Sequence, residues 1–481
     1  MSRNLHVYLI TELGRTARRS PRVTISALPP DALLEIFKFY VDQVYHEDAW
    51  YTLVHVCREW RYVVFDSPRW LHLELRCTDR SPVKKMLDVW PALPIVIDAH
   101  ITNSPRSDVT NVIAALKRHD LVCRIDIWGV PNSLLKSAAI KKRFPQLIDL
   151  TLHSYHKNPP VISDLFLGGS APRLQSLEFK GIPFPFPALG KLLLSTTDLV
   201  TLRLLDIPNS GYISPELIVK SLSALTILQE FSIGFRSPRS LADRERRHLS
   251  LLKRLVLPSL TEFSFKGDSE YLEDIVGRID APALDMVTIT FFNQMVFDTP
   301  LLRDFFSRTE VFQEPYRADV SLTEYHIKIT LSQREGIADR RMLEVRISSR
   351  VSEWQLSSLA QFCSTSLPPL PMLESLGIHG NFLGGPEPID DMDSAPWLEL
   401  LHSFATVKDL TLSGLLIRYV APALRKLTGG GVAEVLPALL RVFVGFGTSG
   451  PAQKAIAQFV TARQLSGYPV AVQTQEAWRP R

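Results

Sequence analysis

"LIDLTLHSYHKNPPVISDLFLGGSAPRLQSLEF", residues 147–179, contains one short pattern twice. The copies "LIDLTL" and "LQSLEF" begin at Leu147 and Leu174, and both carry apolar residues at their first, fourth and sixth positions. The last three positions alternate apolar, polar, apolar, which is typical of a strand with one buried face. Because the pattern recurs after 27 residues, it predicts an architecture built from repeated units.

The same pattern continues through most of the chain. Clear copies begin at Val122, Leu147, Leu174, Leu199, Leu228, Leu260, Leu284, Leu373, Val407 and Leu439. Weaker copies begin at Trp70, Leu93, Leu322 and Met342. A compact single core stops growing at about 250 to 300 residues, whereas this chain has 481 residues, 46% of them hydrophobic. We therefore expect a core that is extended by stacking one unit on the next.

Each unit is expected to contain a strand and a helix. A proline turn precedes many of the strands, as in "APR" at 171–173, and the segment "SPELIVKSLSAL" (Ser214–Leu225) has a helix start followed by apolar residues at helical spacing. Strand, helix and parallel strand in succession wind as a right-handed coil. The predicted fold class is α/β: a solenoid over residues 71–446, with parallel strands on the concave side and helices or loops on the convex side. A C-terminal cap or tail is expected over 447–481.

Residues 290–370 leave two interpretations open. The clear copies at Leu284 and Leu373 are 89 residues apart, close to three periods, and the weaker copies at Leu322 and Met342 partly fill this gap. Two degenerate repeats would explain the segment. A hairpin insertion around the turn "REGIAD" (334–339) would explain it equally well.

The residues between the apolar positions of each strand are expected to point to the concave side. Side by side, Trp128, His153, Lys180 and Arg203 would form a polar stripe with an aromatic anchor. Trp and Arg often dominate the binding energy of protein interfaces, so this stripe is a candidate target-binding surface. The alternative is an inner face that is merely solvated.

The N-terminal part has a different texture. "ISALPPDALLEIFKFY" (25–40) places Pro29 and Pro30 where the first turn of a helix tolerates proline. A second run, "WYTLVHVCREWRYVVF" (50–65), repeats the helical spacing and ends before Pro68. So short a helical unit can bury only a modest core. Either part of its apolar surface belongs to a partner, or all of it packs on the rest of the chain.

This N-terminal unit, residues 25–70, resembles the F-box. That pattern has Leu-Pro, an apolar-Ile-Phe helix, then Leu, Val-Cys and Trp, with a closing Trp. The residues that match it in order are Leu28, Pro29, Ile36, Phe37, Leu53, Val56, Cys57, Trp60, Arg61 and Trp70. The chain departs from the commonest form in Pro30-Asp31 and in a longer loop, Asp42 to Ala49.

The resemblance implies that the unit docks on a Skp-family adaptor, which links it to the cullin and RING subunits of a ubiquitin ligase. The adaptor-contact residues it implies are Leu28, Pro29, Ile36, Phe37, Leu53, Val56, Cys57 and Trp60. The repeats resemble leucine-rich repeats in an irregular form that lacks the usual Asn or Cys after the strand. The chain as a whole resembles the large F-box family of mushroom-forming fungi. In such proteins the repeat array captures a protein target, whose identity the sequence does not reveal.

Signatures of chemistry are sparse. "TGGGVAE" (428–434) lacks the Lys-Ser or Lys-Thr ending of a phosphate-binding loop, and "PIDDMD" (388–393) lacks the Asn and Gly positions of a calcium loop. His153 and His156 have no Cys or Glu at metal-ligand spacing and are interpreted as surface residues. We therefore expect no catalytic residues, no metal and no cofactor, and thus no enzyme.

The charge balance and the cysteine content limit the classes of partner and the cellular compartment that we expect. The chain has 54 basic and 50 acidic residues, intermixed, so its net charge of +4 creates no strong field for nucleic acid or membrane. Cys57, Cys77, Cys123 and Cys363 lie far apart with no C-x-x-C pair, which fits a reducing compartment. The apolar stretch Leu5 to Ile10 is far shorter than the roughly 20 residues that span a bilayer. We expect a cytoplasmic or nuclear protein.

The first 24 residues carry Arg15, Arg18, Arg19 and Arg22. We expect a disordered basic tail; a transit peptide and a nuclear-import patch are the alternatives.

Three hypotheses about function follow. The first is a substrate adaptor of a ubiquitin ligase. The second is an interaction scaffold with no cullin. The third is an enzyme whose site is assembled from residues distant in the sequence.

Overall fold

A computed structural model of the chain describes residues 25, 28–43, 49–68, 70–102, 108–156, 161–238, 254–323, 325–335, 338–348, 352–380, 394–414, 416–427, 434–445 and 450–475. The basic tail, "PIDDMD" and all of "TGGGVAE" except Glu434 lie outside these residues. Among the helices it describes, none is both long and apolar enough to cross a membrane.

The fold is mixed α/β and is organised around one large sheet. Sixteen described strands follow the order β1-β2-β3-β4-β5-β6-β7-β9-β11-β14-β13-β12-β15-β16-β17-β18. Their bounds are β1 (Leu75–Cys77), β2 (Ile95–His100), β3 (Val122–Trp128), β4 (Asp149–His153), β5 (Ser176–Lys180), β6 (Thr201–Ile207), β7 (Glu230–Phe235), β9 (Glu262–Gly267), β11 (Met286–Phe292), β12 (Arg317–Leu322), β13 (His326–Glu335), β14 (Ala338–Ser348), β15 (Ser375–Gly380), β16 (Asp409–Gly414), β17 (Arg441–Gly445) and β18 (Ala471–Gln475). Neighbouring strands are parallel, except that β13 runs antiparallel to β12 and β14. Two short strands, β8 (Leu255–Val256) and β10 (Ile279–Asp280), pair separately.

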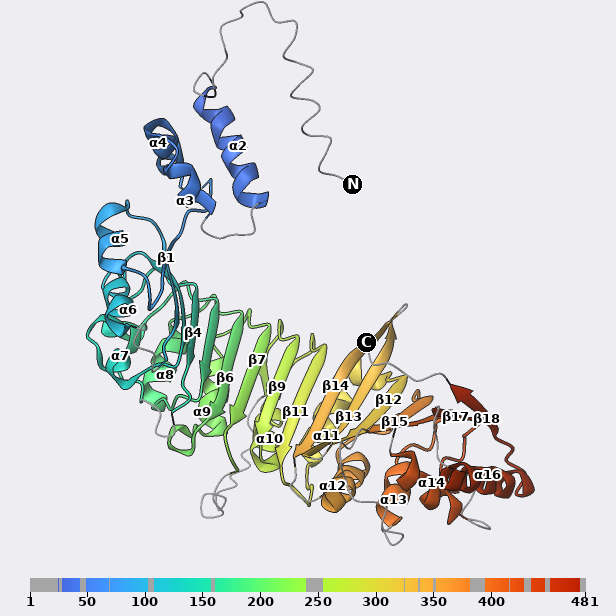
Figure 1. Cartoon of the computed structure of the whole chain (residues 1–481). Coiled ribbons are helices and arrows are strands. Elements are labelled where there is room, and N and C mark those ends of the chain that lie inside the picture. The colour runs from blue at the N-terminus through green and yellow to red at the C-terminus, as the bar shows by residue number, and fades with distance from the viewer. Residues whose placement is uncertain are drawn as a thin grey trace, which may run out of the picture.

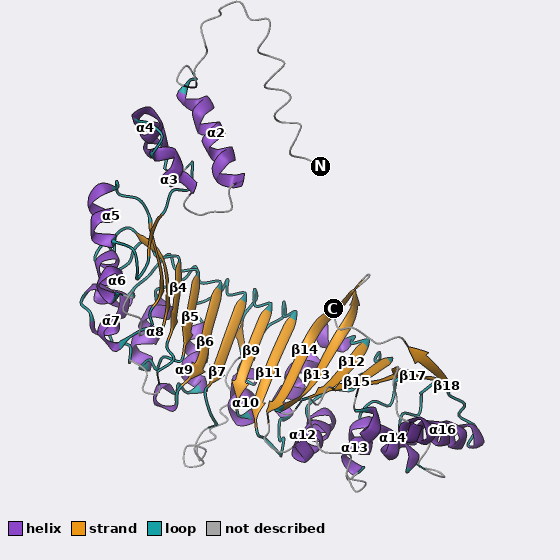
Figure 2. Cartoon of the chain, viewed as in Figure 1, coloured by secondary structure: helices purple, strands orange, loops and turns teal. Residues whose placement is uncertain are grey.

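The sheet curves into an arc, with the strands on its inner side and helices along its outer side (Figures 1 and 2). The outer helices are α5 (Val83–Val89), α6 (Val109–Leu116), α7 (Asn132–Lys136), α8 (Phe186–Leu194), α9 (Pro215–Leu222), α10 (Ser269–Val276), α11 (Pro300–Arg308), α12 (Ser352–Thr365), α13 (Ala395–His402), α14 (Ile417–Arg425) and α16 (Gly450–Leu465). Each of the ten clear copies of the sequence pattern coincides with a strand of this sheet. The predicted α/β class is therefore confirmed.

The alternation within each strand separates a buried layer from an inner surface. Leu150, Leu177 and Leu202 are in register on β4, β5 and β6 and are fully buried on the side of the helices. The next residues along these strands are partly exposed on the inner side. Because strand residues alternate between the two faces, this register aligns both layers across β4, β5 and β6.

The predicted helix after Ser214 is α9, which begins with Pro215 in its first turn. Ile218 and Leu222 are the buried apolar residues of this helix, one turn apart, and they pack toward the sheet. The spacing of its apolar residues therefore predicts both the helix and the face that it buries.

Residues 290–370 contain the hairpin. β13 and β14 pair antiparallel. His326 is opposite Ser348 at one end, and Glu335 is opposite Ala338 at the other, so the connection between the strands is only two residues long. A turn this short can join antiparallel strands, whereas parallel neighbours need a crossover of a dozen residues or more. The hairpin does not project from the sheet but supplies two of its strands, since β14 pairs with β11 and β13 with β12.

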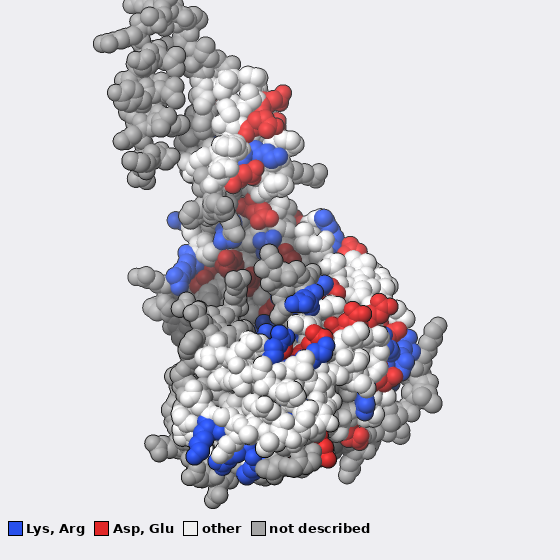
Figure 3. Space-filling model, turned by 90° about the vertical axis from the view of Figure 1, so that its right-hand side faces the viewer, with Lys and Arg blue, Asp and Glu red and all other residues white. Residues whose placement is uncertain are grey.

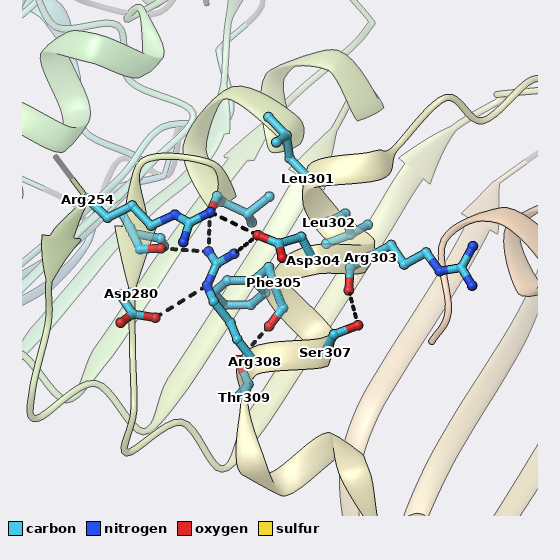
Figure 4. Close-up of polar contacts among 12 residues, drawn as sticks. Arg254, Asp280, Leu301, Leu302, Arg303, Asp304, Phe305, Ser307, Arg308 and Thr309 are labelled. Atoms are coloured by element: carbon cyan, nitrogen blue, oxygen red, sulfur yellow. Dashed lines mark hydrogen bonds and ion pairs between the residues drawn. The ribbon is translucent and has the colours of Figure 1, made fainter. Parts of the chain in front are cut away.

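The outer helices are joined by polar contacts at their ends (Figure 4). Arg308, at the end of α11, donates to the carbonyl oxygen of Val276, the last residue of α10, at 2.8 Å and to that of Ile279 at 3.0 Å. It also pairs with Asp304 and Asp280. Glu273 of α10 accepts hydrogen bonds from the first amides of α11, at 3.0 and 2.6 Å. Because unsatisfied helix ends carry partial charge, these contacts tie one unit to the next.

The segment expected as a C-terminal cap or tail contains α16 and β18, and β18 is the last strand of the main sheet. Arg463 of α16 is fully buried. It donates to the carbonyl oxygens of Val435 at 3.3 Å and Leu436 at 3.2 Å, and its guanidinium lies 5.9 Å from the ring of Phe459. These contacts hold the last helix against the preceding turn.

The N-terminal helices lie beyond the first strand (Figure 1). They are α2 (Pro30–Gln43), α3 (Ala49–Val54) and α4 (Arg58–Asp66). Trp90, which follows α5, meets Trp50 at 5.7 Å and Tyr51 at 5.1 Å between ring centroids, and Phe65 at 5.8 Å. This aromatic cluster joins the N-terminal helices to the first outer helix.

Candidate functional site

The predicted adaptor-contact residues fall into two groups in the structure. Phe37 and Leu53 are buried, with 0% and 5% exposure, and form the core of the three helices. Leu28 and Trp60 are half-buried, and the Trp60 ring lies 4.7 Å from that of Phe37. The exposed group is Pro29, Ile36, Val56 and Cys57.

Cys57 has an identifiable structural role. It is the residue immediately before α4, and its sulfur accepts a hydrogen bond from the backbone amide of Trp60 at 3.4 Å. This is the contact that a helix N-cap makes, because the first amides of a helix have no intrahelical acceptor. Cys57 therefore caps the N-terminal end of α4.

Two exposed aromatic residues were missed by the motif. Phe39 of α2 is 68% exposed and Tyr62 of α4 is 71% exposed, alongside Ile36 at 45% and Val56 at 55%. Ile36 and Phe39 are three residues apart, so they lie on one side of α2. We call Ile36, Phe39, Val56 and Tyr62 the N-terminal apolar set. Helical spacing alone could have identified Phe39, since it falls on a different side of the helix from Leu33 and Phe37.

On the inner face, Trp128 is the centre of an aromatic cluster. Its ring lies 4.2 Å from that of His153, and 6.4 Å from the rings of His100 and Tyr155. Trp128, His153 and Lys180 are directly in register on β3, β4 and β5, as the predicted stripe requires. Tyr155 is 60% exposed, so the cluster is open to solvent on that side.

The interpretation of His153 as a surface residue is wrong. His153 is only 3% exposed because Trp128 packs against its ring, and its Nε2 atom is 2.6 Å from a carboxylate oxygen of Glu178. Its side chain therefore supports the Trp128 ring and is not itself available as a contact. His156 belongs to the exposed residues.

Arg203 lies one row away from the other three residues of the stripe. It is in register with Glu178, whereas Lys180 is in register with Leu205. Its guanidinium donates to Glu230 at 2.5 and 2.7 Å and to Glu178 at 3.2 Å. The hydrogen bond from His153 lowers the pKa of Glu178, and the hydrogen bond to Glu230 raises the pKa of Arg203. Arg203 is thus held in a network that links four strands.

Asp126 on β3 lies in register with a second carboxylate, Asp98 on β2. Burial, and then the neighbouring carboxylate of Asp98 on the next strand, raise its pKa. Its Oδ1 atom is buried and has no hydrogen-bond partner among the described residues. In the hollow between the N-terminal helices and the C-terminal end of the sheet, side chains of both charges lie side by side (Figure 3).

A second polar chain lies near the other end of the sheet. Ser413 Oγ is 2.6 Å from His379 Nδ1, and His379 Nε2 is 2.9 Å from Asp319 Oδ1. Arg317 holds the same carboxylate at 2.7 and 2.8 Å. Burial opposes ionisation of Asp319, but the hydrogen bonds from His379 and Arg317 outweigh it and lower the pKa. An added Cβ at Gly377 would overlap Asp319 Oδ1 and His379 Nε2, so a larger residue here would displace these two side chains.

Within the described residues, no three His, Cys, Asp or Glu side chains come together in a way that would hold a metal ion. All four cysteines are free. Burial raises the pKa of Cys77 to about 12 and of Cys123 to about 11, so neither is an activated thiolate.

Comparison with known proteins gives no family assignment. No protein-family model matches the chain, and no curated protein matches it significantly.

Proposed function

We propose that this protein is the substrate-recognition adaptor of a Skp/cullin/F-box type ubiquitin ligase. Helices α2 to α4 dock on a Skp-family adaptor, through which cullin and RING subunits join, and the inner face of the sheet captures a protein target. The ordered F-box-like residues and the N-terminal apolar set support the first half of the proposal. The aromatic cluster around Trp128 supports the second.

We further propose that the sheet is an irregular leucine-rich-repeat solenoid. In the unit that begins at Leu147, the three apolar pattern positions, Leu147, Leu150 and Leu152, are fully buried. No unit of this size could bury its apolar face alone, so neighbouring units are needed for a continuous core. A repeat array of this kind offers a long inner surface for a protein partner.

The observation that carries the adaptor proposal is the exposure of the N-terminal apolar set. The three helices have a filled core of their own, with Leu33, Phe37 and Val54 at 0% exposure, yet four large apolar side chains remain 45 to 71% exposed. Exposed apolar side chains gathered on one small unit are typical of an interaction surface. A helical partner surface would complete their burial.

The contact between the N-terminal helices and the sheet supports a fixed spacing between the two binding surfaces. Trp50 is 1% exposed and packs against Trp90. Connecting two binding modules rigidly keeps a captured target close to the catalytic subunits. A flexible connection would lower that effective concentration.

The test is co-expression of the tagged chain with a Skp-family adaptor, followed by measurement of the adaptor retained. We expect retention by the native chain and its loss in the double variant Ile36→Asp, Val56→Asp, because a carboxylate in a dry contact costs several kcal/mol. Both positions are about half exposed, so the variant is expected to fold. A matched control is Ile227→Asp with Val256→Asp, whose exposures of 43% and 54% are nearly the same but which lie elsewhere.

Equal retention by both double variants would refute docking through this surface. Recovery of cullin with the bound fraction distinguishes the ligase adaptor from the scaffold hypothesis, because a scaffold would retain its partner without cullin. Circular dichroism and thermal unfolding of each variant verify that the helices are intact.

A further inference from the structure

The hairpin β13–β14 brings two cations face to face. Lys328 and Arg346 are directly opposite in the antiparallel register. The residues that flank them, such as Ile327 and Ile347, are fully buried on the side of the helices, so both cations lie on the inner face. Like charges in directly opposed cross-strand positions destabilise a sheet.

Among the described residues, one carboxylate compensates these cations. Glu344 lies 2.5 Å from Arg346, 3.2 Å from Arg341 and 3.6 Å from Lys328, and its side chain is only 2% exposed. We call Lys328, Arg341 and Arg346 the cation cluster. Among the described residues no other acidic partner of these three is found. The site therefore carries a surplus of two positive charges.

The charge surplus faces solvent while the carboxylate does not. The side chains of Arg341, Arg346 and Lys328 are 53%, 45% and 26% exposed. Burial and the nearby charges of Arg346 and Lys328 lower the pKa of His326, which agrees with a positive potential at this place. A nearly buried carboxylate therefore holds three cations whose side chains remain partly open to solvent.

We propose that the cation cluster binds an anionic segment of a captured protein, at the middle of the inner face. Neighbouring strands are about 4.8 Å apart, so Lys328 and Arg346 can hold two carboxylates of an acidic segment or one phosphate ester of the same total charge. This proposal depends on the proposed function in one respect: the anionic segment is taken to belong to the captured target protein.

The surroundings favour a short anionic segment over a nucleic acid. On one side, Lys266 is paired with Asp206 at 2.8 Å, and on the other Arg317 is paired with Asp319 at 2.7 Å. The cations that flank the cluster on β9 and β12 are therefore already neutralised. A nucleic acid contributes a charge with every phosphate and needs an extended row of cations, whereas an acidic peptide segment needs only a local one.

The test is fluorescence anisotropy of the purified full chain with three labelled peptides of one length. One carries consecutive glutamates, one carries phosphoserine among neutral residues, and one carries glutamine and serine only. We expect the first or the second peptide to bind, and binding to weaken as sodium chloride is raised from about 0.05 to 0.5 M, because salt screens exposed charges. Which of the two binds distinguishes carboxylates from phosphate. Binding of the neutral peptide with equal affinity would overturn the proposal.

Variants of the chain provide a second criterion. The double variant Lys328→Gln, Arg346→Gln should bind the anionic peptide with an affinity lower by about tenfold or more, because charge-assisted hydrogen bonds are lost. The control Lys191→Gln with Lys220→Gln removes the same charge from the outer helices α8 and α9, and should bind normally. Unchanged affinity in the first variant would overturn the proposal. The native chain's salt dependence remains decisive if a variant does not fold. Since no Skp-family protein is present, failure here leaves the adaptor proposal untouched.

Discussion

Replacing Glu178 by Gln should lower the free energy of unfolding by about 1.5 to 2 kcal/mol at pH 7. Glu178 is 16% exposed and accepts from His153 at 2.6 Å and from Arg203 at 3.2 Å. Losing a hydrogen bond to a charged group costs about 1.5 to 3 kcal/mol, but glutamine still offers a neutral acceptor to His153, so about 1 to 1.5 kcal/mol is lost there. Arg203 is 42% exposed and keeps its pair with Glu230, so its share is only about 0.5 kcal/mol.

The effect should depend on pH in a defined direction. The pKa of Glu178 is lowered in the folded chain by the hydrogen bond from His153. A group with a lowered pKa stabilises the fold above its unfolded pKa, about 4.3 for Glu. That stabilisation is lost as the pH falls through the folded value. The difference between the native chain and Glu178→Gln should therefore be constant near neutrality and shrink below about pH 4.

Chemical denaturation at pH 7 and at several values between 3.5 and 5 measures this difference. Glu310→Gln is the control, because Glu310 is an exposed residue that follows α11 and lies outside this network. A difference that grows as the pH falls, or one no larger than that of the control, would refute the assigned network.

The remaining predictions concern separate parts of the molecule. Phe37→Ala should destabilise the N-terminal helices by about 3 to 5 kcal/mol because the ring is fully buried, and should abolish adaptor retention through unfolding, whereas Ile36→Ala should cost well under 1 kcal/mol by thermal melting. Arg308→Met should increase hydrogen exchange at the end of α10 and in the turn that follows it, because the carbonyl oxygens of Val276 and Ile279 lose their donor; unchanged exchange there would contradict the tie between these units. Gly377→Ala should lower the melting temperature because its Cβ would overlap Asp319 and His379. Gly450→Ala should not, because a Cβ there would meet no atom within 4 Å beyond its own helix; equal melting temperatures would count against the packing described.

The strands were the most predictable feature of this fold. In this pattern the fourth to sixth residues alternate between apolar and polar, and the apolar ones are buried. A strand that is covered on one face satisfies both conditions. Alternation also explains why the sequence could not decide between a hairpin and two degenerate repeats in residues 290–370. "LTEYHI" and "MLEVRI" alternate as the other copies do, and alternation does not distinguish parallel from antiparallel neighbours. The connection distinguishes them, and it depends on two residues.

The sequence predicted where the residues of the candidate site lie on the sheet, but not which side chains they contact. Trp128, His153 and Lys180 fall in one row because each follows the last apolar position of its copy. Arg203 is the fifth residue of "LVTLRL", the place that Glu178 has in "LQSLEF", so aligning the copies would have put these two together. The burial of His153 under Trp128 could not be predicted, since alternation places a side chain on a face without saying what covers it.

The contacts of the inner face also change which residues are expected to bind a target. Arg203 already satisfies two carboxylates, so a target that engages it must compete with Glu230 or accept a guanidinium that is largely neutralised. Among the described residues, Trp128 and Tyr155 form no ion pair; Tyr155 is 60% exposed, and the Trp128 ring packs against that of His153. Binding energy at an interface concentrates in preorganised aromatic side chains that become desolvated. The aromatic cluster at β3 and β4 is therefore the stronger anchor, and the paired charges beside it determine which partners are excluded.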